Sequence, residues 1–374
     1  MPLGDVDLSV DWETIEQLGC PWQYCSNSQF KIILPTMKIS KRLSSALFAI
    51  FFLSACQSVS DETELSGSAQ GTTYHIKMVL GGTNVKPDEL HKAVENIFAD
   101  IDYKLSNYRD DSEISQLNRQ KSSEWLPVSK EIADLLSIAK VVHAKTNGCL
   151  DLTIKPLFDL WGFSRHDMKV PVQADIDKVL SHVGLDKIIL DEDRLRILKK
   201  DPEVGIDLSS VAQGYTVGAI AKFLESKGIQ NYMVEIGGEM MVKGRKSNGD
   251  AWRIAIEKPT PFAREVQKII TIHQINGEAV MTSGTYRNFF EENGKTYSHI
   301  LNPQTGKPVD HKLLSVTILH DDPAWADAWD TALLCLGEDE GFKVAESNQL
   351  RALFIYHEGK ELKERVSPEL ERVP

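Results

Sequence analysis

The stretch TSGTYRNFFEENGKTYSHILNPQTGKP (residues 282–308) alternates strand-like runs with polar turns, and a second stretch, ADAWDTALLCLG (326–337), reads as a short helix. The first stretch carries His299 beside a polar turn that contains glycine. The second places Asp327 and Thr331 four residues apart, so both side chains face the same way on a helix. Carboxylate and hydroxyl oxygens suit Mg²⁺, and a histidine titrates near neutral pH. Together these groups predict a site for a phosphate-bearing ligand and a hard metal ion.

Each of these residues, taken alone, more often has a structural role. Asp327 would then lie on a solvated helix face, and Thr331 would bond to its own helix. His299 would be satisfied by a carbonyl group within a strand. Both interpretations stay open until the neighbours of these residues are known.

The pattern of apolar residues indicates the fold class. We expect strands or hairpins at residues 71–79, 187–198, 232–236, 240–243, 252–257, 268–274, 298–301, 313–319 and 352–356. We expect helices at residues 87–105, 129–147, 175–183, 211–227, 323–336 and 340–347. Helices and hairpins are interspersed without a regular strand–helix–strand alternation. This favours an α+β fold on mixed or antiparallel sheets over a doubly wound sheet.

Composition excludes some classes of protein. The chain has 374 residues, of which 42% are hydrophobic and 26% charged, as in ordinary globular proteins. Its net charge of −12 argues against a protein that binds nucleic acid by neutralising phosphates. No long apolar run follows residue 60, which excludes a polytopic membrane protein.

The N-terminal region has the order of a lipoprotein signal peptide. Residues 37–42 are positively charged, residues 43–53 are apolar, and Ser54-Ala55 precede Cys56. We expect residues 37–55 to be cleaved, Cys56 to carry the lipid and residues 56–68 to form a tether. Residues 1–36 would be an over-extended leader, and the fold would begin at Ala69. A buried helix with a chance cysteine is the alternative.

The remaining cysteines lie within the expected domain. Cys149 and Cys335 each have apolar neighbours, so we expect two buried free thiols rather than a disulfide. The spacing of cysteines and histidines does not support a zinc site.

Two further segments carry polar groups at element ends. Residues 207–215 (DLSSVAQGY) join a strand end to a helix start, where backbone N–H groups suit a phosphate. Ser210 would cap this helix or reach a metal ion. The turn at 148–153 precedes aromatic residues that would cover a planar ring or, as we favour for Phe158 and Trp161, belong to the core.

The order of these motifs resembles the ApbE-type FAD:protein FMN transferases over residues 71–356. The blocks that carry the resemblance are SNYRDDSEISQLN (106–118), DLTIKPLFDLWGF (151–163), IDLSSVAQGY (206–215), VEIGGE (234–239), TSGTYRNFF (282–290), YSHILNPQTGKPV (297–309) and ADAWDTAL (326–333). The lipoprotein-like N-terminus also fits this family.

The resemblance implies an activity and a location. The family fold is α+β, a duplicated T-fold-like architecture with a ligand cleft between its parts. The activity would be Mg²⁺-dependent transfer of FMN from FAD to a threonine or serine hydroxyl of an acceptor flavoprotein, with formation of a phosphoester and release of AMP. Acceptors would be flavin subunits of Nqr-type or Rnf-type redox complexes. The protein would lie on the periplasmic face of a bacterial membrane, anchored by the lipid on Cys56, in the inner or the outer membrane.

The resemblance also assigns the site residues. His299 matches the base that takes the proton of the acceptor hydroxyl. The metal ligands would be Asp327, Thr331 and Ser210, the last through its backbone carbonyl. The contacts with FAD would be Tyr108, Cys149, Leu150, Asp151, Asp207 and Gln213.

The chain departs from the family pattern at three positions. Gln213 stands where lysine is frequent, and Gly218 and Thr285 stand where aspartate is frequent. These changes bear on FAD affinity and rate more than on reaction type. A metal-dependent FAD pyrophosphatase and a non-catalytic FAD-binding lipoprotein remain alternatives.

Overall fold

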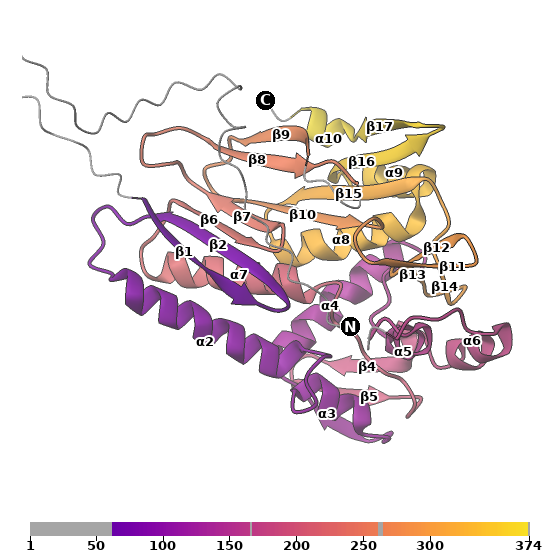
Figure 1. Cartoon of the computed structure of the whole chain (residues 1–374). Coiled ribbons are helices and arrows are strands. Elements are labelled where there is room, and N and C mark those ends of the chain that lie inside the picture. The colour runs from indigo at the N-terminus through magenta and orange to yellow at the C-terminus, as the bar shows by residue number, and fades with distance from the viewer. Residues whose placement is uncertain (1–61, 165–166, 261–264, 373–374) are drawn as a thin grey trace, which may run out of the picture. The chain divides into compact units, whose positions relative to one another are not determined.

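The computed structural model describes residues 62–164, 167–260 and 265–372, and its centre is an antiparallel sheet (Figure 1). This sheet has 8 strands in the order β1-β2-β6-β7-β10-β15-β16-β17. Each neighbouring pair is antiparallel. The strands are β1 (Glu62–Ala69), β2 (Thr72–Val79), β6 (Tyr232–Ile236), β7 (Glu239–Lys243), β10 (Glu278–Gly284), β15 (Leu313–His320), β16 (Arg351–Glu358) and β17 (Glu361–Val366).

Helices cover one face of this sheet. Successive side chains of a strand point to opposite faces, and Ala279 and Met281 of β10 belong to the large apolar core that the helices share. The helices that contribute to this core are α2 (Pro87–Leu105), α3 (Glu113–Arg119), α4 (Lys130–Lys145), α7 (Ala212–Ser226), α8 (Pro323–Leu336) and α9 (Glu338–Ser347). The buried faces of α7 and α8 pack on each other as well as on the sheet.

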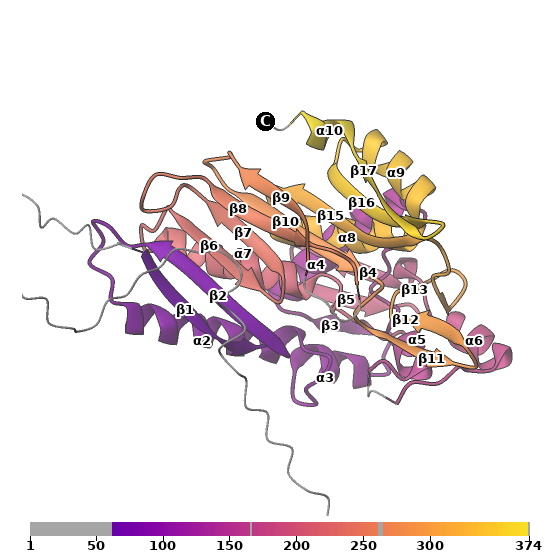
Figure 2. The ribbon, with the colours of Figure 1, turned by 45° about the horizontal axis from the view of Figure 1, so that its top comes forward.

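A hairpin covers the other face where β7, β10, β15 and β16 lie (Figure 2). It consists of β8 (Trp252–Glu257) and β9 (Val266–Ile272). Trp252 and Ile254 pack there with Val280 of β10, the residue between the two that face the helices. The C-terminal helix α10 (Pro368–Glu371) closes this second core through Leu370.

Short elements form a third apolar cluster beside the large core. Trp161 and Leu157 of α5 (Lys155–Trp161) pack there with Ile176 of α6 (Gln173–Leu180) and Leu301. The neighbouring hairpins are β11 (Phe289–Glu292) with β12 (Lys295–Ser298), and β13 (Leu301–Asn302) with β14 (Lys307–Pro308). A small sheet consists of β3 (Trp125–Pro127), β5 (Arg196–Lys199) and β4 (Ile188–Asp191), and the 3₁₀ turn η2 (Leu185–Lys187) directly precedes β4. The burial of Trp161 confirms its expected place in the core.

Most of the expected elements are confirmed, and so is the α+β class with antiparallel sheets. The helices 87–105 and 323–336 and the strands 232–236 and 252–257 have the expected bounds. Each half of the large sheet has two strands before and two strands after its main helices. An origin by duplication stays a prediction.

Two expected segments are wrong. Residues 62–68 are not part of a tether but form β1, which pairs with β2 over its full length. Only Leu65 of β1 is buried, because an edge strand is held by its backbone and needs little apolar surface. The strand expected at 298–301 is interrupted, since His299 and Ile300 lie between β12 and β13.

The expected free thiols are also wrong. Cys149 and Cys335 form a disulfide with their Cα atoms 5.7 Å apart, although 186 positions separate them in the chain. The end of α4 packs against α8, and this brings together two cysteines that both have apolar neighbours. Burial does not distinguish a thiol from a disulfide, so the sequence pattern did not indicate the pairing.

The expected leader, signal peptide and lipidated Cys56 lie outside the described residues. Within residues 62–164, 167–260 and 265–372, no helix combines the length and apolar character needed to cross a membrane.

Candidate functional site

Helix α8 holds Asp327 against the start of α7. Asp322 caps α8 by accepting a hydrogen bond from the N–H of Ala324, 2.9 Å away, and Pro323 follows in the first turn. Asp327 is only 6% exposed, and its Oδ2 accepts a hydrogen bond of 2.7 Å from the N–H of Gly214. A Cβ atom on Gly214 would lie 2.5 Å from the Pro323 carbonyl oxygen, so only glycine permits this approach.

The start of α7 bears on two predictions for residues 207–215: free N–H groups that hold a phosphate, and Ser210 as a helix cap. The N–H of Gly214 is bound to Asp327, so this donor is not free to hold a phosphate. Helix α7 begins at Ala212 with Val211 as its N-cap residue, so the capping interpretation of Ser210 is wrong. Ser210 lies in the turn before α7, four positions before Gly214, and in the described part of the chain no hydrogen bond joins its side chain to Asp327 or Thr331.

Further oxygen atoms surround Thr331. The Oγ of Ser283, on β10, lies 3.0 Å from both Thr331 Oγ1 and Asp330 Oδ1. Asp330 is fully buried, and its Oδ2 has no hydrogen-bond partner in the described part of the chain. Glu239, at the start of β7, accepts a hydrogen bond of 3.0 Å from the N–H of Thr282. Sequence reasoning missed Asp330, Glu239 and Ser283 as members of this cluster.

Burial and mutual repulsion favour protons or a cation at these carboxylates. Burial raises the pKa of Asp327 to about 7. Burial, and next the charge of Asp327, raise the pKa values of both Asp330 and Glu239 well above their usual range. These raised pKa values mean that the buried site disfavours several uncompensated negative charges. A bound cation would compensate those charges.

The donors fit a hard metal ion in their chemistry. The carboxylates of Asp327 and Asp330 and the hydroxyl of Thr331 are oxygen ligands of the kind that Mg²⁺ prefers. In the described residues, no cluster of at least three His, Cys, Asp or Glu side chains has an arrangement able to hold a metal ion. The metal site therefore stays a prediction.

His299 lies in the link between β12 and β13. Its Nδ1 lies 3.0 Å from the carbonyl oxygen of Asn288, and its backbone N–H donates to the same oxygen at the same distance. A carbonyl only accepts hydrogen bonds, so Nδ1 carries the proton and Nε2 keeps a free lone pair. Burial lowers the pKa of His299, with the Asn288 bond opposing it, which favours the neutral ring that a general base requires.

The structure brings together Tyr108 and Asp207, two predicted FAD contacts that lie 99 positions apart in the chain. Tyr108 is 67% exposed and lies next to Asp207 and Ser209. Desolvation of its hydroxyl, and then the charge of Asp207, raise the pKa of Tyr108, while a hydrogen bond with Ser209 opposes the change. Asp207 is buried and its Oδ1 accepts a hydrogen bond of 2.9 Å from the N–H of Ser209. Burial raises the pKa of Asp207.

Two asparagines hold the backbone on either side of Asp207. Asn118 pairs with Ile206 through two hydrogen bonds of 2.7 Å, one to its carbonyl oxygen and one from its N–H. Asn107 donates to the same carbonyl at 2.9 Å and accepts from the N–H of Leu208 at 3.1 Å. These amides fix the segment that carries Asp207. Both asparagines lie in the motif at residues 106–118, but nothing in their spacing indicates that they hold this segment.

The turn that contains Cys149, Leu150 and Asp151 lies beside this segment. The N–H of Asp207 donates to the carbonyl of Leu152 at 2.7 Å. Asp151 is buried, and its two oxygens accept hydrogen bonds from the N–H groups of Thr153 and Leu185 at 2.8 and 2.9 Å. The carboxylate of Asp151 therefore shapes the turn.

A cavity of about 410 Å³ connects this turn with the loop after His299. Its lining includes Gly148 and Asp151 on one side and Pro303 and Gln304 on the other. Gln213 lies apart from this lining, and its side-chain amide donates to the carbonyl of Ile236.

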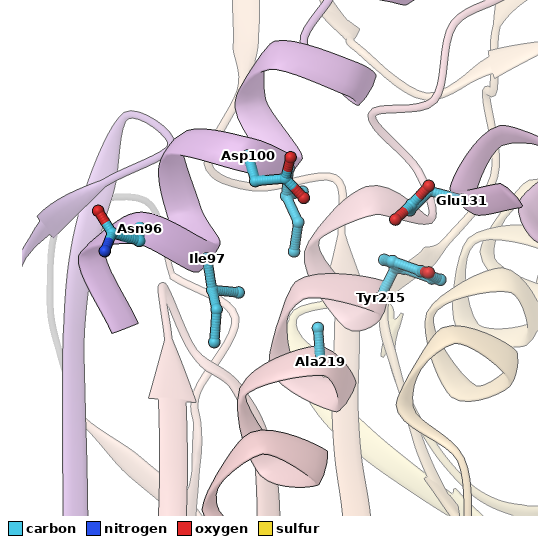
Figure 3. A pocket seen from close by; sticks show the side chains of 7 residues that line it. Asn96, Ile97, Asp100, Glu131, Tyr215 and Ala219 are labelled. Atoms are coloured by element: carbon cyan, nitrogen blue, oxygen red, sulfur yellow. The ribbon is translucent and has the colours of Figure 1, made fainter. Parts of the chain in front are cut away.

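A second cavity, of about 300 Å³, contains none of the predicted site residues (Figure 3). It is lined by Asn96, Ile97, Asp100, Ile101, Glu131, Tyr215 and Ala219. Lys104 lies 2.6 Å from Asp100 and 2.9 Å from Glu131, so the acidic side chains at this cavity already have a cationic partner.

Comparisons with known proteins agree in family and in fold. Residues 70–354 match the model of the ApbE family. The chain is 38% identical over 313 residues to the FAD:protein FMN transferase of Vibrio cholerae, which covers 83% of this chain and 92% of that protein. It is 34% identical over 346 residues to the FAD:protein FMN transferase of Escherichia coli K12, covering 89% of this chain and 97% of that protein.

Solved structures show the same likeness. The flavin transferase ApbE from Vibrio cholerae matches with a TM-score of 0.76 and 37% identity, over 83% of this chain and 99% of that one. The flavinyl transferase ApbE of Pseudomonas stutzeri, in its apo form, matches with a TM-score of 0.77 and 34% identity, over 84% and 97%.

Proposed function

The chain belongs to the ApbE family, and we propose from this premise that it is an FAD:protein FMN transferase. The hydroxyl of an acceptor threonine or serine attacks the phosphorus on the FMN side of the FAD pyrophosphate. A new phosphoester forms, the bond to the bridging oxygen breaks, and AMP leaves. The hydroxyl proton passes to a base. Acceptors are flavoprotein subunits of the Nqr or Rnf kind.

The buried acidic cluster is the observation that carries the chemistry. Asp327, Asp330 and Thr331 would hold Mg²⁺, with Ser210 as a further ligand through its carbonyl. When bound, the ion would supply positive charge that offsets the charge of the pyrophosphate. The unpartnered Oδ2 of Asp330 and the raised pKa of Asp327 support this assignment, because a buried carboxylate without a partner is costly.

His299 is the proposed base. Its Nε2 has a free lone pair, since Nδ1 donates to Asn288. A neutral imidazole in this position accepts the proton of the acceptor hydroxyl as the new bond forms. Tyr108, Asp207, Gln213 and the turn of Cys149, Leu150 and Asp151 would contact FAD.

Location follows from the N-terminal sequence. Export through the signal at residues 37–55 and a lipid on Cys56 would hold the enzyme at the periplasmic face of a bacterial membrane. The folded unit would then begin after a tether that ends before β1 rather than at Ala69.

The test is a labelling reaction with FAD, Mg²⁺ and a purified acceptor domain. We expect a fluorescent acceptor band that survives denaturation, its loss without Mg²⁺, and a much slower reaction with His299→Ala at unchanged FAD binding. Free FMN and AMP without a labelled acceptor would instead identify a pyrophosphatase. Intact FAD in the presence of Mg²⁺ would identify a non-catalytic FAD-binding protein.

A further inference from the structure

The disulfide joins two segments that carry different parts of the candidate site. Cys149 lies in the turn after α4, two residues before Asp151, and Cys335 lies in the last turn of α8. Thr331 precedes Cys335 by four residues, so both lie on one side of the helix. The crosslink therefore connects the turn proposed to line FAD with the helix proposed to hold the metal ion.

A shift of this turn would move the other groups proposed to contact FAD. The carbonyl of Leu152 accepts the N–H of Asp207, and a bridge joins Ile154 to Gly205. Asp207 in turn lies beside Tyr108. The position of the turn relative to α8 thus sets the distance between the proposed flavin contacts and the proposed metal ligands.

The other contacts between this region and α8 are the apolar packing of α4 on α8, in a core that also contains Leu150 and Leu152, and one weak polar contact. The ammonium group of Lys145 lies 5.9 Å from the ring centroid of Trp329, a distance at which a cation–π contact contributes little. Asn147 and Gly148 both have positive φ angles, of 50° and 84°. Left-handed backbone is sparsely populated for a residue other than glycine, so Asn147 has lower-energy conformations available once the turn is released.

We infer that the Cys149–Cys335 disulfide is a redox-dependent crosslink that positions the FAD-lining turn against α8, so that its reduction weakens FAD binding while the protein stays folded. This inference rests on the proposed function, because it assigns the crosslinked turn to FAD. The affinity of the protein for FAD would then depend on whether its surroundings oxidise or reduce this cysteine pair.

Reduction by a dithiol is a balanced exchange. A thiolate of the reductant attacks one sulfur, the S–S bond breaks, and the second thiol of the reductant resolves the mixed disulfide. The protein takes up two electrons and two protons and keeps two thiols, while the dithiol becomes a cyclic disulfide. Cys149 is 9% exposed and Cys335 is 4% exposed, so attack requires the turn to open. Bound FAD should hold the turn closed and slow the reduction.

The test compares the full chain before and after treatment with dithiothreitol. Alkylation and mass spectrometry give the state of the two cysteines, quenching of flavin fluorescence gives the Kd for FAD, and thermal unfolding gives the fold. We expect reduction to raise the Kd about tenfold or more, with a cooperative unfolding transition retained at a lower temperature. We also expect saturating FAD to slow the appearance of thiols.

Variants separate the crosslink from other effects of the reductant. Cys335→Ser should show the weakened FAD binding without any reductant and should not respond to it. Cys56→Ser, which keeps the crosslink and removes the other cysteine expected in the mature protein, should respond to the reductant as the unmodified chain does. Equal FAD affinity in both redox states would overturn the inference. Free thiols at both positions in protein prepared under oxidising conditions would also overturn it, and so would unfolding on reduction. Redox-sensitive FAD binding without FMN transfer would count against the proposed function and in favour of the crosslink.

Discussion

Asp330 shows why buried carboxylates indicate a binding site. One oxygen of Asp330 contacts Ser283, and the other has no partner in the described part of the chain. Its neighbours include Asp327 and Glu239, whose charges raise its pKa further. A protein built only for stability would not keep this arrangement, since an uncompensated buried charge destabilises the fold.

Replacement of Asp330 should therefore separate activity from stability. We expect Asp330→Asn to lower Mg²⁺-dependent turnover by about 100-fold, because it removes a charged ligand. The metal-free protein should become more stable, because the repulsion with Asp327 is gone. Turnover against Mg²⁺ concentration and the Tm of the metal-free protein check both effects. Asp321→Asn is the control, since Asp321 is exposed and pairs only with Arg351 at 3.0 Å among the described residues. A variant with full activity would remove Asp330 from the metal site.

Substitution of Asn118 tests whether its hydrogen bonds to Ile206 hold Asp207 in place for FAD binding. Asn118→Leu keeps the size of the side chain but leaves the N–H and carbonyl of Ile206 without this partner. Each backbone group that loses its hydrogen bond costs about 1–3 kcal/mol when buried. We expect the KM for FAD to rise more than kcat falls, as steady-state kinetics would show. A fall in kcat alone would mean that the hydrogen bonds between Asn118 and Ile206 do not position the residues that contact FAD.

Helices α7 and α8 approach each other closely at a pair of glycines. Gly214 and Gly218 are one turn apart on α7, and both face Pro323 of α8. At Gly214 a Cβ atom would lie 2.5 Å from the Pro323 carbonyl oxygen, whereas at Gly218 the nearest atom is 3.5 Å away. The same substitution therefore meets a clash at one position and ordinary contact at the other.

Alanine substitutions at these two glycines should therefore have different effects on stability. We expect Gly214→Ala to destabilise the protein by about 1–3 kcal/mol, because α7 must move from α8 and from Asp327. Gly218→Ala should be neutral or should stabilise the protein by up to about 1 kcal/mol through helix propensity. Denaturant unfolding of both variants measures the difference. Equal losses would show that the approach of the two helices does not depend on Gly214.

The periodicity of apolar residues was enough to predict most helices and strands, but not the contacts between them. The helix at Pro323–Leu336 was predictable because proline begins it, glycine ends it, and apolar residues repeat between them. β1 was missed because a polar edge strand lacks the apolar alternation of a buried one. The proximity of Glu239 to Asp327 and the Cys149–Cys335 bond were missed because they join residues far apart in the chain. Spacing carries no information on such distances.

Glu278 links the free energy of unfolding of the folded protein to pH. This residue is 1% exposed, pairs with Arg351 at 2.8 Å, and has its pKa raised to about 7 by burial, with Arg351 opposing. The folded state thus holds a proton that the unfolded state releases near pH 4.5. Its contribution to stability is full below pH 4.5 and is lost as pH rises through 7.

The size of this effect follows from the shift. We expect the free energy of unfolding to fall by up to about 3 kcal/mol between pH 4.5 and pH 8 through Glu278 alone. Glu278→Gln should flatten this part of the pH profile, which denaturant unfolding at several pH values would record. An unchanged slope in Glu278→Gln would assign the pH dependence to other groups.

The coupling of FAD cleavage to acceptor labelling tests the central claim most directly. A single reaction with FAD, Mg²⁺ and an acceptor domain gives AMP by chromatography and protein-bound FMN by intact-mass spectrometry. The transfer mechanism predicts one AMP released for each FMN bound to a threonine or serine of the acceptor, with both products lost in Asp327→Ala. AMP in excess of bound FMN, or acceptor labelling without AMP, would contradict it.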